Sequence, residues 1–178
     1  MELSVKPLAL ALMTMAMSLS AHGQDSLEIT INKISASGVG EKVGVVKVEE
    51  TEYGALFRPE LEGLEPGLHG FHVHEKADCG PGEKDGKPVA ALAAGGHWVG
   101  DGKDRHEGPY GQGHQGDLPA LYVDDQGRAG HPVLAPRVKP EDLKGRSLML
   151  HQGGDNYSDH PEQLGGGGGR VACGVIGQ

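Results

Sequence analysis

Short apolar segments, most of them bounded by turns rich in glycine or proline, run through this chain of 178 residues. Residues 26–34 alternate between apolar and polar side chains, which is typical of a half-buried β-strand. Comparable segments are residues 43–50, 55–57, 68–74, 118–124, 131–136, 146–151 and 170–176. Residues 140–143 give a weak helical signal, with proline and acidic residues where a first helical turn favours them. Because strands and helices do not alternate, we predict an all-β antiparallel sandwich or barrel.

Two segments, residues 75–117 and 151–169, carry little strand signal. Long irregular loops are uncommon in compact domains unless they are functional, so a metal or a disulfide is expected to order them. Disorder is the alternative, above all for the five glycines at 165–169. The formal net charge of −9 argues against a nucleic-acid partner, because phosphate binding needs a basic surface.

The first 23 residues are typical of a secretory signal peptide. Lys6 precedes an apolar stretch at 8–19 that is too short to span a membrane, and Ala21 and Gly23 supply the small residues of a cleavage site. We therefore predict a signal peptide at 1–23 and one mature domain at 24–178. An N-terminal helix of the mature fold is the alternative. The residue directly after the predicted cleavage site is Gln24 and not a cysteine, so no lipid anchor is expected there.

Cys79 and Cys173 are the two cysteines of the chain. An even number in an exported protein favours one disulfide bond. Their separation excludes a CxxC redox or zinc motif.

Histidines form the strongest chemical pattern. In GFHVH (70–74), His72 and His74 project from one face of a strand while Phe71 and Val73 face the apolar side. Such a pair suits copper or zinc, although the motif alone is more often structural. A lone loop histidine is usually solvated. The loop that follows carries several histidines, and carboxylates that could also bind zinc or orient a ligand histidine lie near some of them in the sequence. The remaining candidates are His97, His106, His114, Asp117, His151 and Asp155.

Taken together, these stretches resemble the copper/zinc superoxide dismutases, and the exported bacterial branch most closely. The resemblance rests on GFHVH (70–74), AGGH (94–97), KDRHEGP (103–109), GHQGDLPAL (113–121), LMLHQGGDNYSD (148–159) and GGGRVACGVI (167–176), which span nearly all of the mature chain. It implies an eight-stranded Greek-key β-barrel or sandwich with two long metal-site loops, an architecture for which this family is itself an example. It also implies a periplasmic enzyme that disproportionates superoxide to dioxygen and hydrogen peroxide.

The resemblance also implies the roles of individual residues. One copper per subunit is expected on His72, His74, His97 and His151, and one zinc on His97, His106, His114 and Asp117. His97 is expected to bridge the two metals and to act in catalysis, together with Arg170 beside copper. Asp155 is expected to link a copper histidine to a zinc histidine, and Cys79 to pair with Cys173.

One segment departs from the family pattern, and the roles of Lys84 and of three further histidines are not given by the ligand pattern. Trp98, Val99 and Gly100 follow the bridging histidine where the family often has Asn-Pro or Asp-Pro, which leaves the local loop path open. Lys84 is a candidate for steering the anion or an ordinary solvated lysine. His69 lies on the opposite strand face from His72 and is expected to be structural, and His131 and His160 to lie on the surface.

Two rival functions remain, namely a non-catalytic periplasmic copper- and zinc-binding protein on the same fold and a structural adhesion module. The superoxide anion is the expected small-molecule partner, with neither nucleic acid nor a membrane anchor. Tyr53, Trp98 and Tyr110 are expected at the surface, and because aromatic residues favour interfaces, we predict a homodimer.

Overall fold

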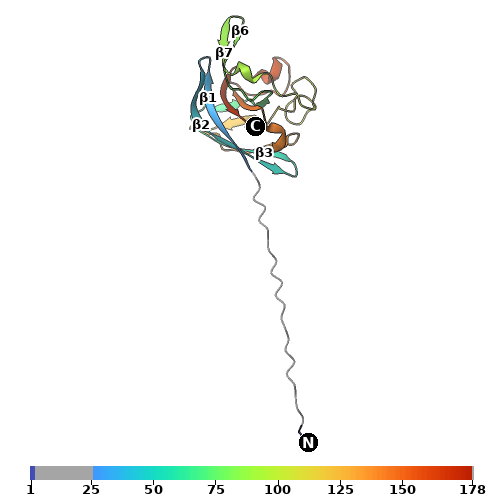
Figure 1. Cartoon of the computed structure of the whole chain (residues 1–178). Coiled ribbons are helices and arrows are strands. Elements are labelled where there is room, and N and C mark those ends of the chain that lie inside the picture. Colours follow the sequence, from blue (N-terminus) through green and yellow to red (C-terminus); the bar gives the residue numbers. More distant parts are fainter. Residues whose placement is uncertain (3–25, 178) are drawn as a thin grey trace.

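The structure is a computed structural model that describes residues 1–2 and 26–177 (Figure 1). The predicted signal peptide therefore falls largely outside the described residues. No helix in the described part of the chain is both long and apolar enough to cross a membrane. The strands are β1 (Leu27–Ser35), β2 (Gly38–Thr51), β3 (Gly54–Leu61), β4 (Gly67–His69), β5 (Phe71–His74), β6 (Gly82–Lys84), β7 (Lys87–Val89), β8 (Leu121–Val123), β9 (Val133–Ala135), β10 (Ser147–His151) and β11 (Arg170–Val175).

Seven of these strands form one antiparallel sheet in the order β5-β10-β11-β1-β2-β3-β9. β4 pairs with β8 in a second sheet, and β6 pairs with β7 as a separate hairpin. Single bridges join Leu61 to Ala129 and His72 to Asp117, so the chain around β8 meets both β3 and β5. The large sheet thus curls around a common interior, which is the predicted β-barrel architecture.

The interior is one apolar cluster to which nearly all the strands contribute. Phe57 of β3 and Phe71 of β5 meet there edge to face, with ring centroids 5.7 Å apart, although four strands separate β3 from β5 in the sheet. Each large side chain buried in this way contributes about 1.5–3 kcal/mol of transfer free energy. The contact shows how the core fixes the curl of the sheet.

A second, smaller apolar cluster lies outside the barrel, around the disulfide bond. It consists of Ile34, Cys79, Ala91, Ala94, Met149 and Cys173. Because it packs the loop after β5 against β1, β10 and β11, the strand β10 is buried on both faces. Apolar packing therefore holds the loop after β5 against the outside of the barrel.

Three short 3-10 helices lie in the described connections: η1 (Leu92–Ala94), η2 (Pro140–Leu143) and η3 (Gln163–Gly166). The helical turn expected at 140–143 is confirmed as η2. Every segment expected to be a strand contains one, although 68–74 is interrupted at Gly70. The β6–β7 hairpin and the helices η1 and η3 lie in the two long loops and were not predicted.

Candidate metal centre

Strand β5 is an edge strand whose outer edge is covered by the long loop that follows it. Val73 donates its N–H to the Gly116 carbonyl (2.9 Å) and accepts from the Trp98 N–H (2.8 Å). These bonds bring His97 beside His74 and Asp117 beside His72. Backbone pairing thus gathers ligand residues that lie far apart in the sequence on the outer face of one strand.

The strand alternation places the β5 histidines as predicted. Phe71 and Val73 enter the barrel core, whereas His72 and His74 face the loops, and all four side chains are buried. Imidazole nitrogens of a first group all lie within 4.8 Å of one another, and this group consists of His72, His74, His97 and His151.

Within this group, the unused nitrogens are held by backbone carbonyls. His74 Nδ1 lies 3.0 Å from the Gly95 carbonyl and His151 Nδ1 lies 3.3 Å from that of Gly168. Their Nε2 atoms face each other at 3.4 Å. Because a carbonyl only accepts, each Nδ1 carries the proton and each Nε2 is free to bind a metal.

A second group shares two of these histidines, and its ligand atoms also lie within 4.8 Å of one another: His72, His97, His106 and Asp117. Asp117 Oδ1 lies 3.0 Å from His97 Nδ1, and its Oδ2 lies 3.0 Å from His106 Nδ1. His114 is outside this tight group, although its Nδ1 faces Asp117 Oδ1 at 3.4 Å. His97 thus belongs to both groups, and its Nδ1 faces Asp117 of the second group.

Asp155 joins the two groups from the second long loop. Its oxygens lie 2.8 Å from His72 Nε2 and 2.7 Å from His106 Nε2. The Tyr157 N–H donates to it at 2.7 Å. A Cβ at Gly165 would collide with this carboxylate, so the close approach of the loop requires glycine there.

Burial and charge divide the cluster into two electrostatic halves. Burial lowers the pKa of His72, His74 and His97, in the last case to about 3, and lowers that of His151 to about 2. These imidazoles are therefore neutral and ready to act as ligands.

The other half is organised by carboxylates. Burial opposes the His106 cation, but the neighbouring carboxylates of Asp117 and Asp155 outweigh this effect and raise the pKa of His106 to about 9. Burial raises the pKa of Asp117 and Asp155, but the histidines around each carboxylate outweigh this effect and lower both pKa values. The surroundings of Asp117 therefore favour a positive charge beside it, which a divalent cation would supply.

Two buried imidazole nitrogens, His72 Nδ1 and His97 Nε2, have no hydrogen-bond partner among the described residues, and two more, His106 Nδ1 and His114 Nδ1, face Asp117 without forming an aligned hydrogen bond. An unpartnered buried polar atom is costly, and metal coordination removes that cost. Four imidazoles suit copper, and three imidazoles with one carboxylate suit zinc. The donor sets therefore fit both metals.

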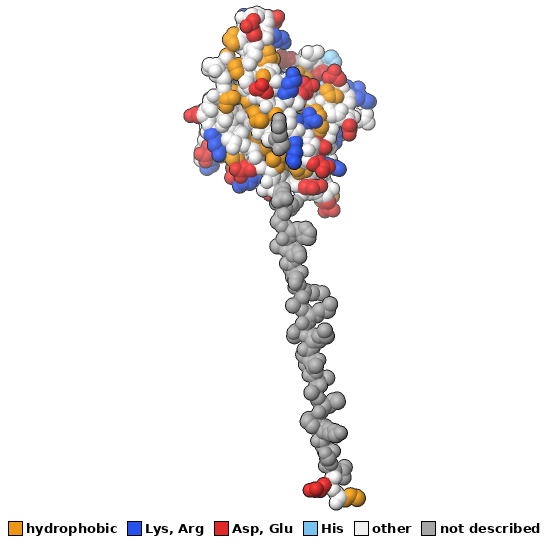
Figure 2. All heavy atoms as spheres, viewed as in Figure 1, with side chains coloured by type: hydrophobic (Ala, Val, Ile, Leu, Met, Phe, Trp, Pro, Cys, Tyr) orange, Lys and Arg blue, Asp and Glu red, His pale blue; other side chains and the backbone are white. Residues whose placement is uncertain are grey.

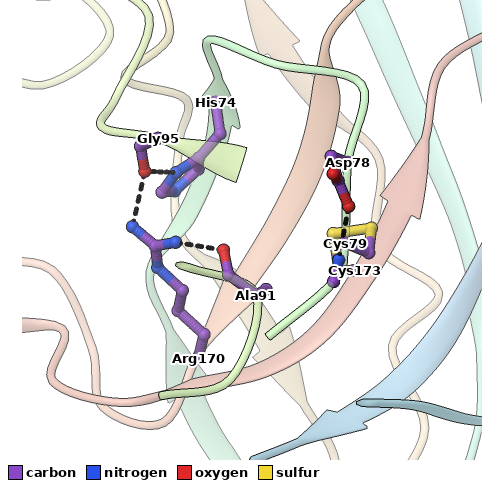
Figure 3. The surroundings of a disulfide bond; sticks show 8 residues. His74, Asp78, Cys79, Ala91, Gly95, Arg170 and Cys173 are labelled. Carbon is purple, nitrogen blue, oxygen red and sulfur yellow. Dashed lines mark hydrogen bonds between the residues drawn. A yellow bond between two sulfur atoms is a disulfide. The ribbon is translucent and has the colours of Figure 1, made fainter. Parts of the chain in front are cut away.

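Arg170 lies beside the first group and is held by backbone carbonyls (Figure 3). It donates to the Ala91 carbonyl and, at 2.6 Å, to the Gly95 carbonyl that also faces His74. Both carbonyls belong to the loop that the Cys79–Cys173 disulfide fixes to β11, with a Cα–Cα distance of 5.9 Å. The predicted disulfide is confirmed.

Several smaller predictions have clear outcomes. His69 is structural, since its two ring nitrogens lie 2.6 and 2.8 Å from the carbonyls of His151 and Glu65. His131 and His160 are exposed. The surface position expected for Trp98 is wrong, because this residue is only 8% exposed and the Arg146 guanidinium lies 4.0 Å above its ring.

Sequence reasoning missed the groups that hold the ligands from behind. The carbonyls of Ala91, Gly95 and Gly168 carry no side-chain signal at all. Asp159 accepts the His106 N–H (2.9 Å) and the Leu164 N–H (3.0 Å), but nothing in its spacing from His106 indicates this contact.

A family model described as copper/zinc superoxide dismutase matches residues 42–176. Superoxide dismutase (Cu-Zn) 2 of Salmonella typhimurium is 50% identical over 173 residues, which cover 97% of this chain and 99% of that protein. The Cu/Zn superoxide dismutase structure from Brucella abortus is 51% identical, with a TM-score of 0.83 over 85% of this chain and 99% of that chain. The solution structure of the monomeric Salmonella enterica enzyme is 53% identical, with a TM-score of 0.77 over the same shares. The chain belongs to the copper/zinc superoxide dismutase family.

Proposed function

We propose that this protein disproportionates superoxide, converting two superoxide anions and two protons into dioxygen and hydrogen peroxide. The observation that carries the proposal is the pair of buried donor groups sharing His97, with unpartnered nitrogens turned towards both. Copper, when bound, supplies the one-electron redox chemistry.

Each metal would be held by a defined set of atoms. We assign copper to His72 Nδ1, His74 Nε2, His97 Nε2 and His151 Nε2. We assign zinc, which has no redox chemistry, to the other side of the cluster, where it would order the loop. Its ligands would be His97 Nδ1, His106 Nδ1, His114 Nδ1 and an oxygen of Asp117.

The chain's own residues then perform three tasks. Arg170 offers a fixed cation that binds and orients the anion beside the copper donors. His97 Nε2, buried and without a partner among the described residues, is placed to hold a proton and pass it to the peroxide product. Asp155 keeps His72 and His106 in the tautomers that leave their Nδ1 atoms free.

The test is to purify the mature chain, quantify copper and zinc, and measure superoxide consumption on the same sample. We expect one copper and one zinc per chain with rapid turnover, and no turnover from protein loaded with zinc alone. Both metals bound without turnover would favour the non-catalytic metal-binding function. A fully stable, metal-free protein would favour the structural module.

We also propose that the protein is exported to the periplasm with cleavage after Gly23. The support is the apolar segment and the small residues before that bond. Cell fractionation followed by N-terminal sequencing should give a periplasmic chain that begins at Gln24. An intact N-terminus in the cytoplasm would contradict this.

The homodimer stays a proposal. Tyr53 and Tyr110 are 67% and 74% exposed and so are available for an interface, whereas Trp98 is not. Light scattering on the purified protein should give twice the mass of one chain. The relative from Salmonella enterica is described as monomeric. If the measured mass is that of a single chain, the dimer proposal is wrong.

A further inference from the structure

Gln115 stands between two residues of the proposed zinc site, His114 and Asp117, and its side chain joins two other segments. Its Oε1 accepts the Asp101 N–H at 3.1 Å, and its Nε2 donates to the Arg137 carbonyl at 2.8 Å. Gln115 thereby connects the zinc-site loop to the chain between β9 and η2.

The Arg137 side chain in turn bonds to Gly113, the residue before His114. Its Nη2 donates to the Gly113 carbonyl at 2.5 Å, while its Nη1 is buried without a partner among the described residues. A Cβ at Gly102 would collide with that Gly113 carbonyl, so the loop closes tightly over this contact. Both chain neighbours of His114 are therefore attached to Arg137.

The segment that carries Arg137 is itself fixed to the barrel. The Val138 carbonyl accepts the Ala55 N–H of β3 at 2.9 Å, and the Val138 side chain lies in the main core. Because Val138 is fixed in this way, Arg137 holds the zinc-site loop at a fixed place relative to the barrel.

The residues that follow His97 also pack against Gln115. The Val99 carbonyl accepts the N–H groups of Gly102 and Gln115, both at 3.0 Å. Gly100 has φ of +57°, and a Cβ there would collide with Gln115 Oε1. Gln115 thus occupies the space that the Trp98-Val99-Gly100 path leaves open.

Besides the bonds at its chain neighbours, His114 is held by its own N–H, which donates to the Arg105 carbonyl at 2.9 Å, and its Nδ1 faces Asp117 Oδ1 at 3.4 Å. The Nε2 atom of His106 lies 2.7 Å from the buried carboxylate of Asp155, whereas His114 Nε2 is 3.4 Å from Asp104, whose side chain is 92% exposed. A contact that open is screened by water and contributes little. The placement of the His114 ring therefore depends on its backbone.

We propose that Gln115 and Arg137 form a reciprocal clasp that positions His114 and sets how long zinc is retained. They act through His114 and do not touch the metal themselves, so they are positioning residues. The inference rests on the proposed zinc site.

The experiment uses the copper- and zinc-loaded protein and the variants Gln115→Leu and Arg137→Leu. Zinc release to a chromogenic chelator is followed well below the melting temperature. We expect release about tenfold faster in each variant, at the low end of the 10–100-fold effect of groups behind metal ligands. Copper content should not change.

Cobalt in place of zinc gives a second readout, because its visible spectrum reports the geometry of the ligands. The bands should change in both variants but not in Gln112→Leu, the matched control from the same loop. The Gln112 side chain accepts from the exposed Lys103 Nζ and, in the described part of the chain, forms no hydrogen bond with Gln115 or Arg137. If Gln115→Leu does not fold, Gln115→Glu keeps an acceptor for the Asp101 N–H and replaces the donor to the Arg137 carbonyl with a carboxylate oxygen, which also breaks that bond.

Two results would overturn the proposal in different ways. Wild-type release rates and cobalt spectra in both clasp variants would refute the clasp while leaving the zinc site intact. Wild-type protein that takes up neither zinc nor cobalt would refute the zinc site itself, and the clasp with it.

Discussion

At the scale of single residues, the Arg170 guanidinium is held by two carbonyl oxygens rather than by a carboxylate. No ion pair to it occurs among residues 26–177. Its charge is therefore positioned but not neutralised, which is the arrangement a small anion needs for capture. Superoxide dismutases are themselves a known example of electrostatic steering, which raises association rates by about 10–1000-fold.

Replacing Arg170 by Ala should leave copper and zinc content unchanged and slow superoxide turnover by at least ~10-fold. Arg170→Lys should be intermediate, because a lysine is a point charge and does not span both carbonyls. Turnover at low and physiological salt measures the effect, with the exposed, ion-paired Arg128→Ala as control. Unchanged turnover of Arg170→Ala at physiological salt would refute the role.

At the scale of elements, the strands were predictable and the loops were not. The alternation of Leu27, Ile29 and Ile31 is a local signal that the barrel core satisfies directly. The sequence did not reveal that Gly70 separates β4 from β5, because the break depends on the Gly70 N–H bonding to the distant Gly153 carbonyl. The proposed ligand residues could be named as a set through the family resemblance, but the backbone carbonyls that hold them depend on tertiary contacts.

His97 ties the loop 75–117 to β5, and its loss should loosen the whole loop. His97→Ala removes a donor from both groups and the contact with Asp117, so zinc should be lost and copper weakened. Metal analysis and hydrogen exchange across 97–117 measure this, with His131→Ala, a change of an exposed histidine, as control. Normal zinc content in His97→Ala would contradict the assignment.

The disulfide acts on the neighbouring part of the same loop. Closing a loop of 94 residues should stabilise the fold by about 4–5 kcal/mol as an upper figure. Denaturant unfolding of metal-free wild type and the double variant Cys79→Ser/Cys173→Ser measures it. Turnover of the metal-loaded variant should also fall, because Arg170 loses its fixed carbonyls. Equal stability and turnover would show that the loop is held by packing alone.

At the scale of the whole molecule, the net charge of −9 is not gathered into one field on the face that Figure 2 shows. Acidic and basic side chains are interspersed there. Because salt screens exposed charges beyond about 8 Å, a local cation decides the capture of a small anion. A negative overall charge is therefore compatible with an anionic substrate.

The two long loops meet at the cluster and at the groups around it, where Asp155 bonds to His72 and His106 and Asp159 bonds to the backbone of His106. Metals that bind the native state alone should therefore stabilise the entire domain. A metal at 100 times its dissociation constant adds about 2.7 kcal/mol, which for a domain of this size raises the melting temperature by about 5–10 °C. Calorimetry before and after chelation measures the loss, and adding copper and zinc back should restore it. Arg170→Ala should show the same loss on chelation, because its guanidinium holds no metal. Identical melting temperatures with and without metals would mean that the loops are ordered by the polypeptide alone.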